Sequence, residues 1–364
     1  MNQVVNKNKV KHYPALDGLR GLAILLVIFY HNFGFINYSV FGWVGVDLFF
    51  VLSGFLITAI LLNTVNAENY LKNFYARRIL RIFPLYCLSL IIFLFILPYF
   101  FPLKAQAQFY LDHQWWYWLY LQNWLLSFHF PITTSYLNHY WSLAVEEQFY
   151  LIWPLIILWL RKPKPLLIFM IFLLILLLAA RSAVWMQKIE GLNYTTFYTF
   201  TRIDGICIGC MLALLHRINF NFLRNNTGVI VILLAILNFG FYFLNQIGEF
   251  PYLAFVGYTT FAAMFGLLVH EAVSGETKVI NFIFTRRILI FFGIISYGLY
   301  IFHWPVYELL YPVFQKTISN SLDISSTLNR AISAILVTVI AIIISVFSYY
   351  GFENKFLKLK KYFV

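Results

Sequence analysis

The side chains best suited to chemistry in this chain lie inside its first apolar stretch, residues 15–36. This stretch is hydrophobic enough to span a bilayer, yet it contains Asp17, Arg20 and His31. Ionisable side chains are costly inside a membrane and usually serve a function there. His31 follows Arg20 by eleven positions, which puts both on one face of a helix, roughly 20° and about 16 Å apart. A neutral imidazole can accept a proton at neutral pH, so we predict a catalytic role for His31.

Each of these three residues also has a structural interpretation. Asp17 lies three positions before Arg20, and the two could pair or simply mark the aqueous end of the helix. His31 could be a hydrogen-bonded core histidine, although its place deep in an apolar segment favours a functional role.

Carboxylates enter two further apolar segments near the side of the membrane where His31 is expected. Asp47 begins the segment GVDLFFVLSGFLIT, and Glu146 and Glu147 follow Ser142 in YWSLAVEEQFYLIWP. Ser142 and Glu146 are four residues apart and can share a helical face. The alternative is that these acids only stabilise the positive N-terminal ends of their helices.

A basic cluster precedes the third apolar segment, where Arg77, Arg78 and Arg81 lie among aromatic residues. Guanidinium groups in this pattern are typical of a phosphate-binding site. The alternative is an ordinary cytoplasmic loop that contacts anionic lipid.

Other polar residues in the apolar segments have two open interpretations. Arg202 and Asp204 stand at the start of one segment, where we expect them to form a stabilising ion pair. His303 precedes a proline inside another segment and could be either a hydrogen-bonded core residue or part of the site.

The composition excludes a soluble globular protein and predicts an all-α, polytopic membrane helix bundle. Of 364 residues, 62% are hydrophobic and 11% are charged, and the mean hydropathy is +0.77. Apolar runs predict about ten transmembrane helices, near residues 15–36, 43–63, 82–103, 141–160, 165–186, 196–216, 228–246, 251–271, 288–312 and 330–351. We expect the tryptophan-rich residues 106–130 to be interfacial or re-entrant.

The distribution of basic residues predicts that both termini are cytoplasmic. With about ten spans, nearly all Lys and Arg residues of the loops fall on the side of the N-terminus, as cytoplasmic loops do. The net charge of +12 is therefore a consequence of topology and does not indicate nucleic-acid binding. With no repeat or linker in view, we expect residues 1–364 to form a single transmembrane domain with no appended soluble domain.

Several ordered motifs resemble the acyltransferase-3 family of integral membrane O-acyltransferases. They are YPALDGLRGLAILLV with the following His31, then GVDLFFVLSGFLIT, RRILRIFPLY, YWSLAVEEQFYLIWP, RIDGICIG and ISYGLYIFHWP. The resemblance implies transfer of an acyl group, commonly acetyl, from cytoplasmic acyl-CoA to a hydroxyl of an extracytoplasmic polysaccharide or its lipid-linked precursor. It also implies a multi-pass protein of the cell inner (plasma) membrane. Acyl-CoA would be a donor substrate, with no bound cofactor and no metal.

The resemblance assigns functional roles to Arg20 and His31 and maps the double-arginine motif onto Arg77, Arg78 and Arg81, as acyl-CoA contacts. We expect His31 to act as general base or transient acyl carrier. A carboxylate would orient its ring, with Glu146 or Glu147 as first candidates and Asp47 as the second. Ser142, Arg202, Asp204 and His303 are possible acceptor-site or structural residues. The alternatives are an acyltransferase with a small-molecule acceptor such as an antibiotic, and a non-catalytic transporter or flippase.

Overall fold

The structure is a computed structural model that describes residues 12–100, 104–128, 136–186, 194–219, 227–247 and 252–363. Within these ranges every regular element is a helix, and no strand occurs. The predicted all-α membrane bundle is therefore confirmed.

The long helices of the first half of the chain are α1 (Pro14–Asn32), α2 (Val44–Thr64), α3 (Tyr70–Ile91), α8 (Trp141–Leu160) and α9 (Pro163–Met186). Those of the second half are α12 (Asp204–Arg217), α13 (Thr227–Ile247), α14 (Tyr258–Ser274), α16 (Arg287–Ile294), α17 (Ser296–Ser321) and α18 (Ser326–Ser348). Shorter helices are α4 (Leu97–Phe100), α5 (Lys104–Asp112), α6 (Gln114–Trp118), α7 (Gln122–Phe128), α10 (Tyr194–Phe197), α11 (Thr199–Arg202), α15 (Lys278–Phe284) and α19 (Asn354–Leu359). Turns of 3₁₀ helix are η1 (Asn37–Trp43), η3 (Asn138–Tyr140) and η6 (Lys360–Tyr362), and π-helical turns are η2 (Ile92–Ile96), η4 (Leu253–Gly257) and η5 (Tyr349–Glu353).

Each of the predicted apolar runs overlaps a helix. Among the described residues, seven helices are long and apolar enough to cross a membrane, or eight if α16 and α17, which meet at 73°, form one bent span. The predicted number of about ten spans stays a prediction. The tryptophan-rich residues 106–130 fall on the short helices α5, α6 and α7, so this segment contains no membrane-length helix among the described residues.

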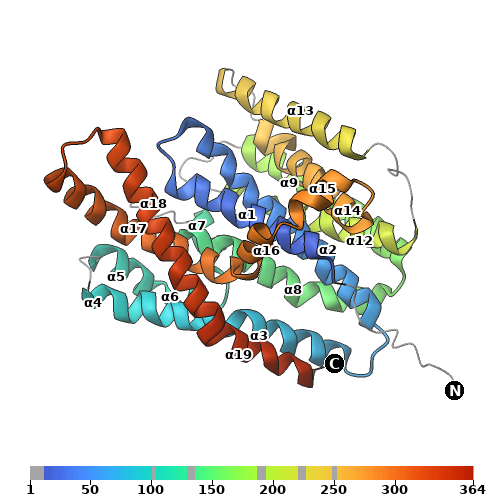
Figure 1. Ribbon diagram of the computed structural model, residues 1–364. Helices are drawn as coiled ribbons and strands as arrows, with labels where there is room; N and C mark the ends of the chain where they lie inside the picture. The colour runs from blue at the N-terminus through green and yellow to red at the C-terminus, as the bar shows by residue number, and fades with distance from the viewer. Residues whose placement is uncertain are drawn as a thin grey trace.

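The first helix lies in the middle of the bundle, as Figure 1 shows for α1 in blue. It begins at Pro14, whose missing N–H and fixed φ suit the first helical position. It packs against α2, α16 and α17. In contrast α13, in yellow, lies at the edge, and its outward apolar side chains such as Ile232 and Ile236 are exposed. The central position of α1 allows residues of several helices to meet its polar side chains.

Glycine permits two backbone-to-backbone contacts of α2. A Cβ atom at Gly45 would lie 2.4 Å from the carbonyl oxygen of Ala23 in α1, and one at Gly54 would lie 2.1 Å from the carbonyl oxygen of Ile206 in α12. Small residues allow membrane helices to approach this closely. Gly45 thus allows α2 to approach α1, whereas Gly54 allows it to approach α12.

Candidate active site

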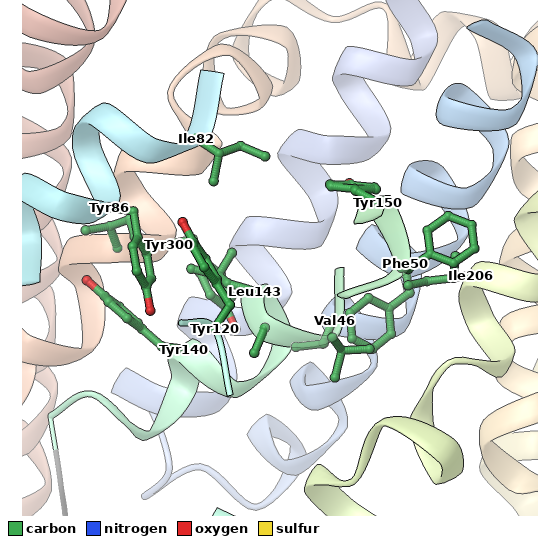
Figure 2. Packing of buried hydrophobic residues seen from close by; sticks show 14 of the residues in the cluster. Val46, Phe50, Ile82, Tyr86, Tyr120, Tyr140, Leu143, Tyr150, Ile206 and Tyr300 are labelled. Carbon is green, nitrogen blue, oxygen red and sulfur yellow. The ribbon is translucent and has the colours of Figure 1, made fainter. Parts of the chain in front are cut away.

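A cavity of about 180 Å³ opens between α1, α2, α3, α8 and α17. The bend between α16 and α17 turns Ser296, Tyr297 and Tyr300 toward it. Figure 2 shows part of its wall, where Ile82 of α3, Tyr150 of α8 and Tyr300 of α17 approach one another from three helices. The volume is below the roughly 300 Å³ of the smallest pockets for drug-sized ligands, so the cavity can hold only a small part of a larger ligand.

Three arginines line this cavity: Arg20 of α1 and Arg78 and Arg81 of α3. Arg20 donates to Asp17 at 2.9 Å, which confirms the predicted pair. Among the described residues, Arg78 and Arg81 make no ion pair with a carboxylate within 4.0 Å. Arg78 instead lies over the rings of Phe74 and Tyr150. Two partly buried guanidinium groups without a carboxylate partner form a site that can accept an anion.

Arg77 does not belong to this group, although the sequence places it with Arg78 and Arg81 in one basic cluster. Its side chain is exposed outside the cavity, and it donates to the backbone carbonyl of Phe363 at 3.2 Å. Arg78 and Arg81, three residues apart, face inward instead.

Glu146 and Glu147 line the same cavity as the arginines. Glu146 interacts electrostatically with Arg20, Arg78 and Arg81, and Glu147 with Arg78. Among the described residues neither acid makes a hydrogen bond to His31, so the expected position of a carboxylate beside that ring is wrong. Both acids therefore lie on the arginine side of the cavity and not beside His31.

Two pairs of hydroxyl groups cross the cavity wall. Ser53 and Tyr150 are 2.5 Å apart. At the other end Tyr300 donates to the carbonyl of His139 at 2.7 Å, so its oxygen accepts from Ser142 at 2.6 Å. Ser142 is therefore part of the wall and links α8 to α17. His303 follows Tyr300 by one helical turn.

His31 contacts another histidine. Its Nδ1 lies 3.0 Å from Nε2 of His303 in α17. His303 is fully buried, whereas His31 is partly exposed and packs against the rings of Tyr30 and Trp304 at centroid distances of 4.9 and 4.7 Å. The fold thus brings His31, for which the sequence favours a functional role, against His303, whose role the sequence left open.

A third histidine, His139, joins this group from η3. Its ring centroid is 5.1 Å from that of His303 and 5.5 Å from that of Tyr300. The side chain is 4% exposed, and neither ring nitrogen has a hydrogen-bond partner among the described residues. We define His31, His303 and His139 as the histidine cluster.

Asp47 does not lie in the histidine cluster but in a separate network of buried charges. It accepts from Arg202 at 3.0 Å, while Asp204 accepts from Arg181 at 2.9 Å and from Thr259 at 2.7 Å. The predicted pairing of Arg202 with Asp204 is therefore wrong, because each side chain meets a partner from another helix. Arg202 also lies 3.7 Å from the ring centroid of Tyr258. This geometry gives Asp47, Arg202 and Asp204 a structural role in joining α2, α9, α11 and α12.

The sequence alone did not predict the contact of His31 with His303 or the roles of His139, Tyr150 and Tyr300. One sequence pattern does indicate that part of the site lies on a single helix face. Ser296, Tyr300 and His303 recur at intervals of three to four residues in an otherwise apolar helix, which places them on one inward face. No local signal identifies His139, because it lies outside the long helices.

No group of three or more His, Cys, Asp or Glu side chains in the described part of the chain is arranged to hold a metal ion.

Comparison with known proteins agrees with the motifs on which this site is built. The model of the acyltransferase-3 family, described as an acyltransferase domain, matches residues 13–350. The chain belongs to this family. The matched range contains the arginine-lined cavity and the whole histidine cluster. As a family member with several membrane-length apolar helices, the protein is a multi-pass membrane protein.

Two relatives illustrate the similarity. The peptidoglycan O-acetyltransferase OatA of Listeria monocytogenes is 35% identical over 337 residues, which cover 85% of this chain and 52% of the relative. The O-acetyltransferase OatA of Staphylococcus aureus is 30% identical over 317 residues, which cover 81% and 51%. The chain thus spans about half the length of the curated relatives it matches. No solved structure matches this chain.

Proposed function

We propose that this protein transfers an acyl group, acetyl as in its named relatives, from acyl-CoA to a hydroxyl of a cell-wall polysaccharide or its lipid-linked precursor. The observation that carries the proposal is the arginine-lined cavity, in which Arg78 and Arg81 have no carboxylate partner among the described residues. Phosphate groups are the natural partners of such guanidinium groups.

The shape and charge of the cavity suit a donor that has phosphates at one end and a thin arm at the other. About 180 Å³ has room for part of a pantetheine arm with a short acyl group, but not for a nucleotide as well. We therefore place the phosphates at the cationic mouth and the thioester toward Tyr300.

In the proposed reaction His31 takes the proton of the acceptor hydroxyl. The acceptor oxygen forms a bond with the acyl carbonyl carbon, the carbon–sulfur bond of the thioester breaks, and the proton passes to the leaving CoA thiolate. General-base assistance of this kind contributes about 10²–10⁴ in rate. The names of the relatives support peptidoglycan as the acceptor. The predicted topology supports a cytoplasmic donor, and the family supports a location in the plasma membrane. The alternative of a non-catalytic transporter or flippase has no support from the names of the relatives.

The test uses membranes containing the full chain with radiolabelled acetyl-CoA and cell-wall glycan. We expect label in the glycan, and an apparent KM for acetyl-CoA that rises in Arg78→Ala and Arg81→Ala. Charge-assisted contacts are worth about 1.5–3 kcal/mol each, which corresponds to roughly 10- to 150-fold. Arg77→Ala is the matched control, because this neighbouring arginine lies outside the cavity, and its effect is expected to be several-fold smaller.

Thioester cleavage without label in any glycan would support a small-molecule acceptor instead. Equal effects of Arg77→Ala and Arg78→Ala on KM would remove the cavity from donor binding and favour a general effect of positive charge at the membrane surface.

A further inference from the structure

We infer that His303 is a positioning residue for the reaction: it fixes His31 in the tautomer that carries its hydrogen on Nδ1 and leaves Nε2 free to accept the acceptor's proton. This inference rests on the proposed function, since it explains how His31 can be a base. The two rings are joined by one contact of 3.0 Å between His31 Nδ1 and His303 Nε2.

The ring hydrogen of His303 is on Nδ1. Its Nδ1 lies 2.8 Å from the backbone carbonyl oxygen of Tyr300 and 3.1 Å from that of Leu299, in the preceding turn of α17. Carbonyl oxygens only accept hydrogen bonds, so Nδ1 of His303 must be the donor. The tautomer of a histidine is set by the bond that its other nitrogen makes. Here the helix backbone of α17 sets it.

The surroundings of His303 contain no anion that would stabilise a positive charge on its ring. The titratable side chains in ring contact with it are His31, His139 and Tyr300, and none of them is an anion at neutral pH. Asp47 is paired with Arg202, and Glu146 and Glu147 lie at the arginines of the cavity. A buried positive charge without an anion is costly, so His303 is neutral. With Nδ1 protonated, its Nε2 carries a lone pair.

The contact between the two rings decides which nitrogen of His31 carries its hydrogen. Because Nε2 of His303 can only accept, Nδ1 of His31 must carry the hydrogen that bridges the 3.0 Å contact. Nε2 of His31 then carries the lone pair. The ring also forms a hydrogen bond with the backbone carbonyl of Val27 in the preceding turn of α1, an acceptor that the same Nδ1 hydrogen can serve. His31 is also the more exposed of the two rings. The free lone pair is thus on the ring that the hydroxyl of the acyl acceptor can reach.

The matched pair of variants is His303→Leu and His303→Gln. Leucine has no acceptor, so His31 Nδ1 loses its partner in α17 and the ring loses the contact that orients it. Removing the hydrogen-bond partner of a metal-bound histidine typically costs about 10- to 100-fold, and we take the same range for the partner of His31. We expect kcat to fall by that factor while the KM for acetyl-CoA stays unchanged. The amide oxygen of glutamine can accept from His31 Nδ1, so this variant should recover most of the loss.

The control is a second histidine pair elsewhere in the bundle. His216 Nε2 and His270 Nδ1 are 2.9 Å apart, between α12 and α14. His216→Leu removes the same kind of bond away from the site and should leave kcat near the parent value. A kcat of His303→Leu near the parent value, or a His303→Gln no better than His303→Leu, would overturn the inference.

A readout independent of turnover comes from NMR of the purified chain with ¹⁵N-labelled histidine, in which His31 is assigned by comparison with His31→Gln. The expected spectrum shows His31 protonated on Nδ1 and unprotonated on Nε2 at neutral pH. The opposite tautomer would overturn the inference even if His303→Leu fails to fold. A parent chain that transfers no acyl group but shows this tautomer would instead count against the proposed function alone.

Discussion

At the scale of single residues, the candidate site separates a cationic end from an imidazole end. Arg20 and His31 lie on one helix, yet they meet different partners, the arginines of α3 in one case and His303 in the other. Tyr300 stands between the two groups, because it lines the cavity and begins the turn of α17 that ends at His303. None of the three histidines lines the cavity, so the proposed function requires the acyl group to reach His31 past this tyrosine.

The role proposed for His31 is tested most directly by His31→Gln. Glutamine keeps hydrogen-bonding capacity toward His303 but cannot act as a base at neutral pH. We expect acyl transfer to fall at least about 10²-fold while membrane abundance stays normal, measured by label transfer and by immunoblotting of the same membranes. A variant that inserts normally and transfers near the parent rate would leave His31 as a structural histidine.

At the scale of the helices, buried charge pairs and close backbone contacts join the elements around the site. Asp47 and Arg202 are both nearly fully buried, and Asp47 Oδ2 and Arg202 Nε have no hydrogen-bond partner among the described residues. Losing one partner of such a pair leaves an uncompensated charge, at a cost of about 3–5 kcal/mol. The network therefore depends on having both partners.

This dependence gives a prediction for Asp47. Asp47→Leu should lower the thermal unfolding midpoint in detergent strongly, and the double variant Asp47→Leu/Arg202→Met should restore most of it, because no charge is then left unpaired. Restored stability together with restored transfer would establish the structural role. If the double variant is stable but inactive, Asp47 has the catalytic role that the sequence first suggested.

The contact of α2 with α12 gives a second prediction at this scale. Gly54→Ala would put a methyl group 2.1 Å from the carbonyl oxygen of Ile206, so the two helices must separate. We expect a lower unfolding midpoint in detergent. Gly240→Ala in α13 is the matched control, because a Cβ atom there meets nothing within 4 Å. Similar effects of the two substitutions would show that helix propensity and not packing is being measured.

At the scale of the whole molecule, the arginine cluster and the end of the chain lie together. The start of α3 packs beside α19, as Figure 1 shows, and Arg77 donates to the carbonyl of Phe363. Lys358, Lys360 and Lys361 follow in the same region of the chain. This gathering of basic residues suits a cytoplasmic surface, where Lys and Arg concentrate. It also suits the approach of a phosphate-rich donor.

The predicted orientation can be tested by cysteine labelling of intact cells. Loops 64–81, 161–164, 217–227 and 272–287 are expected in the cytoplasm with both termini. In a background with Cys87 replaced by serine, Lys164→Cys should resist a membrane-impermeant thiol reagent, while Asp323→Cys, between α17 and α18, should react. Labelling of position 164 from outside would reverse the topology and with it the side from which the donor enters.

The sequence by itself determined the helical membrane class, the family and the positions of the polar residues along each helix. These features depend on hydrophobic run length and on the 3.6-residue period, which are local. It also identified the Asp17–Arg20 pair, because residues three apart on a helix are neighbours.

The tertiary structure decided which polar residues meet. Asp47 pairs with Arg202 across 155 positions of sequence, and His31 contacts His303 across 272. The rotation and depth of each helix against its neighbours select these partners. Periodicity fixes which residues share a face, but it does not say which other helix that face meets. The arginines show the same limit. Arg77 and Arg78 are adjacent in sequence, and only the packing of α3 beside α8, where Arg78 lies over the ring of Tyr150, decides that Arg78 faces the cavity and Arg77 does not.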